Sequence, residues 1–125
     1  MMEWKYIEEI PLIPVEIINP YNSHRSKQLA LVDSGSDWCS LPKQLWDDLD
    51  FSDIGLLELG TPLGWAEVGF SWCNMNIIDK MIPVEIHYTS GDEILIGRNA
   101  MKHFIITFDG KKGKIIIKNT ASSPK

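Results

Sequence analysis

The sequence lacks an excess of basic residues, and this absence excludes two classes of partner. Its 125 residues include 12 Lys and Arg against 17 Asp and Glu, a formal net charge of −5. Nucleic acids and anionic membrane surfaces bind positively charged patches, so we predict neither as a partner. The chain also lacks an apolar run of the roughly 20 residues that span a bilayer, and its start does not read as a signal peptide. We therefore expect a cytoplasmic protein.

Cysteine is scarce as well, since the chain has only Cys39 and Cys73. Two thiols fit neither a disulfide framework nor a four-ligand zinc site, so we expect both to be reduced. The three histidines share no metal-ligand spacing. Phosphate-binding glycine loops, the dinucleotide fingerprint, the serine-hydrolase elbow and the zinc-protease helix are all missing. We expect no cofactor and no metal.

Most of the chain has the pattern of short β-strands separated by turn residues. A hydrophobic content of 44% with 23% charged residues is typical of a globular domain. We predict an all-β barrel or sandwich over residues 1–118 and a flexible C-terminal tail over 119–125. The expected strands are residues 4–10, 14–18, 28–32, 56–59, 65–72, 75–78, 81–88, 93–96, 104–109 and 114–118.

Two segments depart from the strand pattern. Residues 42–49 begin with Pro42 and place leucines on one side, which predicts a short helix with Ser40 as its cap. Residues 99–103 are long enough for one or two helical turns. The expected fold therefore has one or two short helices beside its strands.

An internal repeat relates the two halves of the chain. The pentapeptide Ile-Pro-Val-Glu-Ile occurs at residues 13–17 and again at 82–86. Each copy is followed by a polar turn, an apolar strand and a glycine-containing loop that leads to a helix. The matching order of elements favours an internal duplication, which would bring the two glycine loops together near a local two-fold axis.

Asp33 is the strongest candidate for chemistry. An apolar strand leads directly to it, and Ser34 and Gly35 follow. Alone, Asp-Ser-Gly is ordinary turn chemistry, because these residues are among the commonest in turns. The context is more specific: residues 30–37 read Ala-Leu-Val-Asp-Ser-Gly-Ser-Asp, and about sixty residues later 94–101 read Ile-Leu-Ile-Gly-Arg-Asn-Ala-Met.

With these two segments the chain resembles the retropepsin-like aspartic peptidases, the single-domain relatives of the retroviral proteases. The resemblance extends over residues 11–109, although 51–79 match only in their strand–turn–strand rhythm. The residue after the catalytic Asp is usually Thr in this family and is Ser34 here. The resemblance implies a retropepsin-like closed barrel with a pseudo-two-fold repeat, and aspartic endopeptidase activity with Asp33, Ser34 and Gly35 in the catalytic loop.

The same resemblance implies a symmetric homodimer. Peptide hydrolysis by this route needs two carboxylates that share one proton, since two held close together cannot both ionise easily. This chain has one Asp-Ser-Gly, and its second repeat has Ile96-Gly97-Arg98 at the equivalent place. Asp33 from each copy would therefore meet on the two-fold axis. The expected substrate is a peptide or protein bound as an added β-strand.

Supporting roles also follow from the resemblance. The Ser34 hydroxyl would hydrogen-bond across the axis, and Gly35 would let the backbone approach closely. Arg98 would form a structural ion pair with Asp37, for which its planar guanidinium is suited.

A flap hairpin, formed by residues 56–59, a glycine-bounded tip and 65–72, would close over the substrate. Trp38 and Leu95 would line the substrate pocket together with Leu63 and Trp65. Core or interface packing is expected for the tryptophans at 4, 46 and 72. The flap residues are Gly60, Thr61, Pro62, Leu63, Gly64 and Trp65.

Two other hypotheses remain. The first is a non-proteolytic module with the retropepsin-like fold that binds peptides or mediates dimerisation, because a fold does not by itself determine a function. The intact Asp33-Ser34-Gly35 argues against it. The second is a plain β-barrel in which this tripeptide is only a turn, and the presence of both motifs makes it the least favoured.

Overall fold

The computed structural model describes residues 1–119, which form ten strands and two short helices. This confirms the all-β class. In chain order the elements are β1 (Met2–Lys5), β2 (Leu12–Ile18), β3 (Arg25–Val32), β4 (Cys39–Pro42), α1 (Lys43–Asp48), β5 (Gly55–Thr61), β6 (Gly64–Ile77), β7 (Lys80–Thr89), β8 (Ile94–Ile96), α2 (Arg98–Met101), β9 (Phe104–Asp109) and β10 (Lys114–Asn119).

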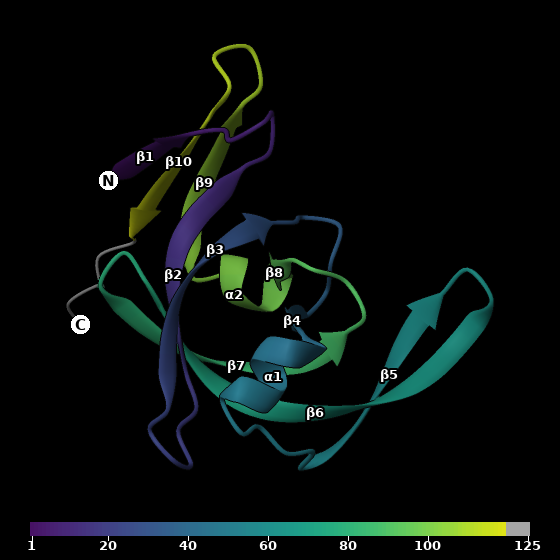
Figure 1. The fold of residues 1–125 in the computed structure, drawn as a ribbon. Coiled ribbons are helices and arrows are strands. Elements are labelled where there is room, and N and C mark those ends of the chain that lie inside the picture. The colour runs from purple at the N-terminus through teal and green to yellow at the C-terminus, as the bar shows by residue number, and fades with distance from the viewer. Residues whose placement is uncertain (120–125) are drawn as a thin grey trace, which may run out of the picture.

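Six strands close into a barrel (Figure 1). Their order is β2-β3-β8-β4-β7-β6, and a further pairing between β2 and β6 completes the ring. Most neighbours are antiparallel, but β3 runs parallel to β8 and β4 runs parallel to β7. Because β3 and β4 belong to the first half of the chain and β7 and β8 to the second, these two parallel pairings join the halves.

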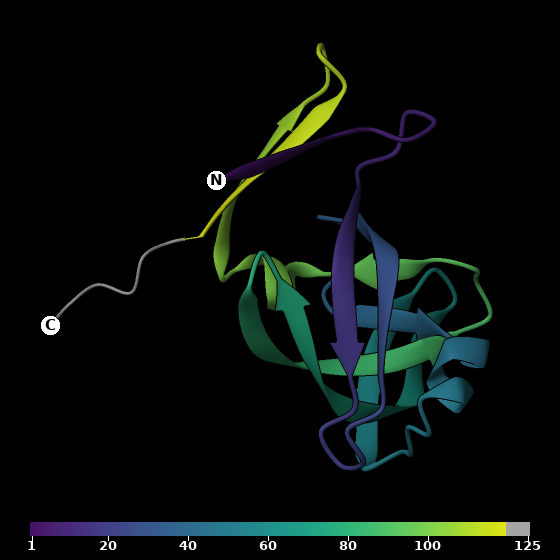
Figure 2. The same cartoon turned by 60° about the vertical axis from the view of Figure 1, so that its left-hand side comes forward.

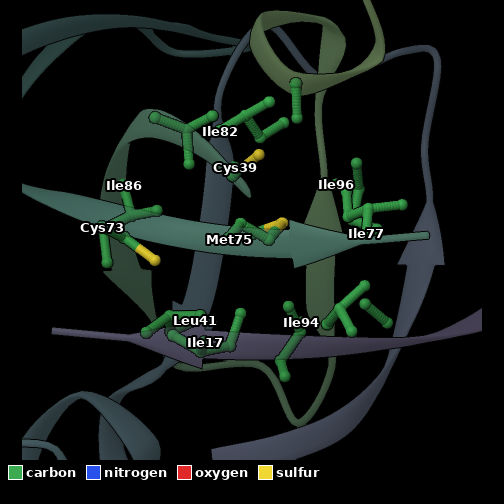
Figure 3. Packing of buried hydrophobic residues seen from close by; sticks show 14 of the residues in the cluster. Ile17, Cys39, Leu41, Cys73, Met75, Ile77, Ile82, Ile86, Ile94 and Ile96 are labelled. Atoms are coloured by element: carbon green, nitrogen blue, oxygen red, sulfur yellow. The ribbon is translucent and has the colours of Figure 1, made fainter. Parts of the chain in front are cut away.

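The barrel interior is filled by side chains that alternate along the strands. In β2, Ile13, Val15 and Ile17 are buried while Pro14 is exposed. Figure 3 shows that aliphatic side chains from several strands point toward one another, together with the side chains of Cys39 and Met75. Burying this surface is the main favourable contribution to folding, and period-two alternation assigns each strand its inner face.

The two repeats have the same pattern of burial. Residues 82, 84 and 86 of β7 are buried, as are residues 13, 15 and 17 of β2, while the proline of each copy is exposed. The first repeat then passes through β3, a loop and β4 to α1, and the second passes through β8 and a short loop to α2. The internal pseudo-two-fold repeat expected from the pentapeptide is therefore present in the fold.

A second sheet, of order β1-β10-β9, projects from one end of the barrel (Figure 2). All of its pairings are antiparallel. Ile115 and Ile117 of β10 are buried and extend the core toward this sheet. The chain thus brings its first and last described strands side by side.

The predicted strands at 65–72 and 75–78 are wrong as separate elements. They form the single strand β6, which pairs with β5 at its start and with β7 and β2 toward its end. One long strand serves here because it continues from the β5–β6 hairpin into the barrel wall.

Strand β4 was missed, and Ser40 is not a helix cap. The residue before α1 is Pro42, with no side-chain cap, whereas Ser40 is buried within β4. The strand has only four residues and owes its conformation to parallel pairing with β7, which no local pattern reveals.

Both chain ends differ from the predicted boundaries. The first strand does not continue to residue 10, because Glu8 and Glu9 adopt positive φ in a tight turn closed by Ile7 and Ile10. Asn119 belongs to β10 rather than to the tail, and the remainder of the predicted tail lies outside the described residues.

Of the tryptophans expected in packing roles, Trp46 is buried at 2% exposure and lies against Phe51 and Tyr88, with ring centroids 5.3 and 5.2 Å away. Trp4 is half-buried and packs against the core. Trp72 is 39% exposed, so only part of its ring is covered within one chain.

Candidate active site

Asp33 directly follows β3, in a turn that orients its carboxylate. The Asp33 N–H donates to the carbonyl of Ile96 in β8 at 3.0 Å, which fixes the end of the strand. Its Oδ1 accepts the Gly35 N–H at 2.9 Å, and its Oδ2 accepts the Ser36 hydroxyl at 2.9 Å. Both oxygens are therefore held by the turn that Asp33 begins, and the side chain is half-buried.

The loop of the second repeat holds this turn in place. The Arg98 guanidinium donates to the carbonyl of Ser34 at 2.8 Å and forms an ion pair with Asp37. The Arg98 N–H donates to the carbonyl of Ser36 at 2.8 Å, so main chain and side chain act together. Arg98 and Asp37 thus tie the second repeat to the Asp33 turn.

Gly97 permits the close approach of the two loops. A Cβ atom at this position would lie 2.4 Å from the carbonyl oxygen of Trp38, well inside van der Waals contact. At Gly35 a Cβ would lie 3.2 Å from Asp33 Oδ1, so a side chain there would press on the carboxylate. Space therefore requires glycine at position 97 and favours it at position 35, and neither residue has an unusual backbone angle.

A cavity of about 230 Å³ lies beside the turn. Trp38 and Leu95, the two residues predicted for the substrate pocket, both line it. It extends from Gly35, Ser36 and Asp37 in the turn to Leu59 and Gly60, which lie near the tip of the β5–β6 hairpin. The cavity is therefore lined by the residues that follow Asp33 in the turn, by the predicted pocket residues and by the end of β5.

The hairpin itself extends away from the barrel as an arm (Figure 1). Thr61 Oγ1 donates to the carbonyl of Gly64 at 2.6 Å and closes the tip. Leu63 and Trp65 are 101% and 78% exposed. In the single chain these two apolar tip residues are not part of the cavity lining, to which the hairpin contributes Leu59 and Gly60 of β5 instead.

Solved structures of retroviral proteases resemble this chain. The simian foamy virus (mac) protease superposes with a TM-score of 0.55 at 18% sequence identity, covering 73% of this chain and 91% of that one. The EIAV protease complexed with the inhibitor HBY-793 gives a TM-score of 0.57 at 17% identity, covering 77% of this chain and 88% of that one.

The fold is retropepsin-like. At these identities the likeness concerns the fold, because a shared fold can serve different functions. No protein-family model and no curated protein matches the sequence.

Within this retropepsin-like fold, sequence reasoning missed two supporting residues. Ser36 bonds the Asp33 carboxylate, and its place three residues later is a signal typical of polar turns. Asn99 accepts the Cys39 thiol at 3.2 Å and donates to the carbonyl of Glu85 at 3.0 Å, joining β4, α2 and β7. Its only sequence signal is that it follows Gly97-Arg98.

In residues 1–119 no three His, Cys, Asp or Glu side chains cluster as metal ligands. No helix of that part of the chain has the length and hydrophobicity of a membrane span.

Proposed function

We propose that this chain is an aspartic endopeptidase that works as a symmetric homodimer. The observation that supports this most directly is the Asp33 carboxylate, held by two hydrogen bonds at a strand end beside a cavity, in a fold shared with retroviral proteases. The chain contains one such loop, so a second carboxylate must come from a second copy.

The proposed reaction needs only the two Asp33 carboxyl groups and a water molecule. The ionised carboxylate takes a proton from water as the water oxygen bonds to the scissile carbonyl carbon, while the protonated one donates its proton to the carbonyl oxygen. The resulting tetrahedral diol collapses: the carboxyl group that took the water proton gives it to the departing nitrogen, the C–N bond breaks, and the other carboxylate takes a proton from one hydroxyl as the carbonyl forms again. One proton thus circulates between two carboxylates, and neither a cofactor nor a metal takes part.

Three neighbouring features have proposed roles in this dimer. Ser34 is exposed next to Asp33, and its hydroxyl would bond across the two-fold axis. The Asp37–Arg98 pair would hold the Asp33 turn in place against the loop of the second repeat. The exposed apolar tip, including Leu63 and Trp65, would cover an extended peptide and exclude water.

We also propose that the protein is located in a reducing compartment, the cytoplasm. Cys39 and Cys73 are both free and buried, and secreted domains of this size more often use their cysteines in disulfides.

Cleavage of a denatured protein mixture tests the proposal. We expect the wild type, at a concentration well above micromolar and between about pH 3 and pH 7, to cleave, and Asp33→Asn to lose all cleavage because an amide cannot exchange the proton. Asp48→Asn makes the same chemical change on α1, away from the site, and serves as the control. Equal cleavage by wild type and Asp33→Asn would contradict the proposal, and binding without cleavage would favour a peptide-binding module.

A further inference from the structure

The cavity beside the Asp33 turn has a buried polar group in its wall. Ser40 is 1% exposed, and its hydroxyl oxygen has no hydrogen-bond partner among the described residues. In β4 its neighbours Cys39 and Leu41 are both part of the barrel core. Because side chains alternate along a strand, Ser40 points to the opposite face, where it lines the cavity.

Two strands flank Ser40 and extend this polar wall. In the sheet its register partners are His87 on β7 and Leu95 on β8, and side chains of register partners lie on the same face. Both residues line the cavity. The wall therefore has an aliphatic side chain on one flank of the serine and an imidazole on the other.

The His87 imidazole is placed to accept a hydrogen bond from a ligand. Its Nδ1 lies 3.3 Å from the carbonyl of Tyr88, so with Nδ1 as the donor the other ring nitrogen is an acceptor. Burial lowers the pKa of His87 below its ordinary value, which favours this neutral form.

Charge in the cavity is already balanced. Asp37 is the acidic residue among those lining it, and its carboxylate is paired with Arg98. A charged substrate group would enter without a free counter-ion and would lose its hydration. An uncharged group that can both donate and accept hydrogen bonds suits Ser40 and His87 better.

We propose that this cavity is a specificity subsite that selects an uncharged hydrogen-bonding substrate side chain, such as Asn, Gln, Ser or Thr, close to the scissile bond. The inference rests on the proposed function, because it takes Asp33 as the catalytic residue beside the cavity. An aliphatic side chain of the same size leaves the Ser40 hydroxyl unpaired in an apolar contact, whereas an amide or hydroxyl satisfies it.

Peptides that differ at one position by Asn against Leu, or by Thr against Val, test this subsite, since the members of each pair have nearly the same shape. At one position near the scissile bond we expect the wild type to favour the polar member by about 10-fold in kcat/KM. Ser40→Val combined with His87→Leu should remove or reverse that preference while other positions keep theirs. If the double variant fails to fold, Ser40→Ala removes the hydroxyl alone and should reduce the preference.

Ser71→Ala is the matched control. Ser71 is also fully buried and its hydroxyl has no hydrogen-bond partner within residues 1–119, but it lies on β6 and is not part of the cavity wall. Its removal should leave the peptide preferences unchanged. If Ser40→Ala changes the preferences no more than Ser71→Ala does, the subsite is wrong even when cleavage depends on Asp33.

Binding separates this inference from the proposed function. The same peptides, labelled with a fluorophore, are titrated with Asp33→Asn and with the Ser40 variants, and fluorescence polarisation is measured. A polar preference in binding that requires Ser40, with no cleavage by the wild type, would support the subsite and contradict the peptidase. Cleavage or binding that favours Leu over Asn at every position would overturn the subsite, as would an absence of both cleavage and binding.

Discussion

Burial separates two kinds of reactive side chain in this molecule. Asp33 is half-buried in a turn beside a cavity, whereas Cys39, six residues later, is completely buried in the barrel core together with Cys73. Burial raises the pKa of each thiol to about 12. Since the thiolate is the nucleophilic form, the folded chain offers carboxylate chemistry at its surface and no thiol chemistry.

We predict that neither cysteine reacts with an aromatic disulfide reagent at about pH 8 while the protein is folded. In denaturant both thiols should react, which is the control. The free energy of unfolding should also fall as the pH rises above the ordinary thiol value of 9.0, because the unfolded chain ionises there while the folded chain stays protonated to about 12. Reaction of the folded protein at the rate of the denatured chain would contradict this.

The hydrogen bonds of individual side chains could be predicted from the sequence where their partners are near in the chain. The two donors to the Asp33 carboxylate lie two and three residues away, so the motif alone indicates the turn. Asn99 and Cys39 are 60 residues apart, and Ser40 meets His87 only through strand pairing. The Asp37–Arg98 pair was predicted across a similar distance because the family resemblance, not the local pattern, supplied it.

At the scale of elements, the contact between the β8–α2 loop and the Asp33 turn depends on main-chain bonds. Backbone N–H groups of Arg98 and Asn99 donate to the carbonyls of Ser36 and Asp37 at 2.8 and 3.2 Å. Such bonds require the two backbones to lie side by side, which Gly97 allows. The contact between these two loops is therefore a structural link between the halves of the barrel.

Gly97→Ala should destabilise the fold by about 1–3 kcal/mol, since the added Cβ meets the Trp38 backbone, which cannot move aside without disturbing the turn. Gly110→Ala is the matched control, because no atom of the part of the chain that the structure describes lies within 4 Å of a Cβ added there. Chemical denaturation of both variants measures the difference. Equal unfolding free energies for the two variants would show that the loops tolerate separation.

Elements were predictable where β-branched and aromatic residues are bounded by turn residues, and β9 agrees with the predicted 104–109 at both ends. The prediction failed at β4 and β6 for a physical reason. The four residues of β4 are all partly or fully buried, so they lack a polar alternation to mark the strand. The 14 residues of β6 change partners along their length, and the local sequence does not encode a partner.

At the scale of the whole molecule, the proposed function requires two copies for one active site. Mixed dimers of wild type and Asp33→Asn would contain one carboxylate and one amide, and would be inactive. This makes activity depend on the square of the wild-type fraction when subunits exchange freely.

An equimolar mixture of wild type and Asp33→Asn should therefore retain about one quarter of the activity of wild type at the same total concentration. A monomeric enzyme would retain about one half. Mixing wild type with Asp48→Asn is the control and should retain full activity. Peptide cleavage rates after equilibration, with sedimentation to confirm the dimer, distinguish these outcomes.

The parallel pairings between the two halves also determine when the site can form during folding. The Arg98 guanidinium and the Ser34 carbonyl that it binds are 64 residues apart, and the β3–β8 pairing closes a similar loop. Such long-range pairs carry a large loop-closure entropy and form slowly. On the ribosome, a nascent chain carries Asp33 long before the residues that hold its turn are synthesised. The Asp33 turn is therefore held in its final conformation only when nearly all of the barrel exists.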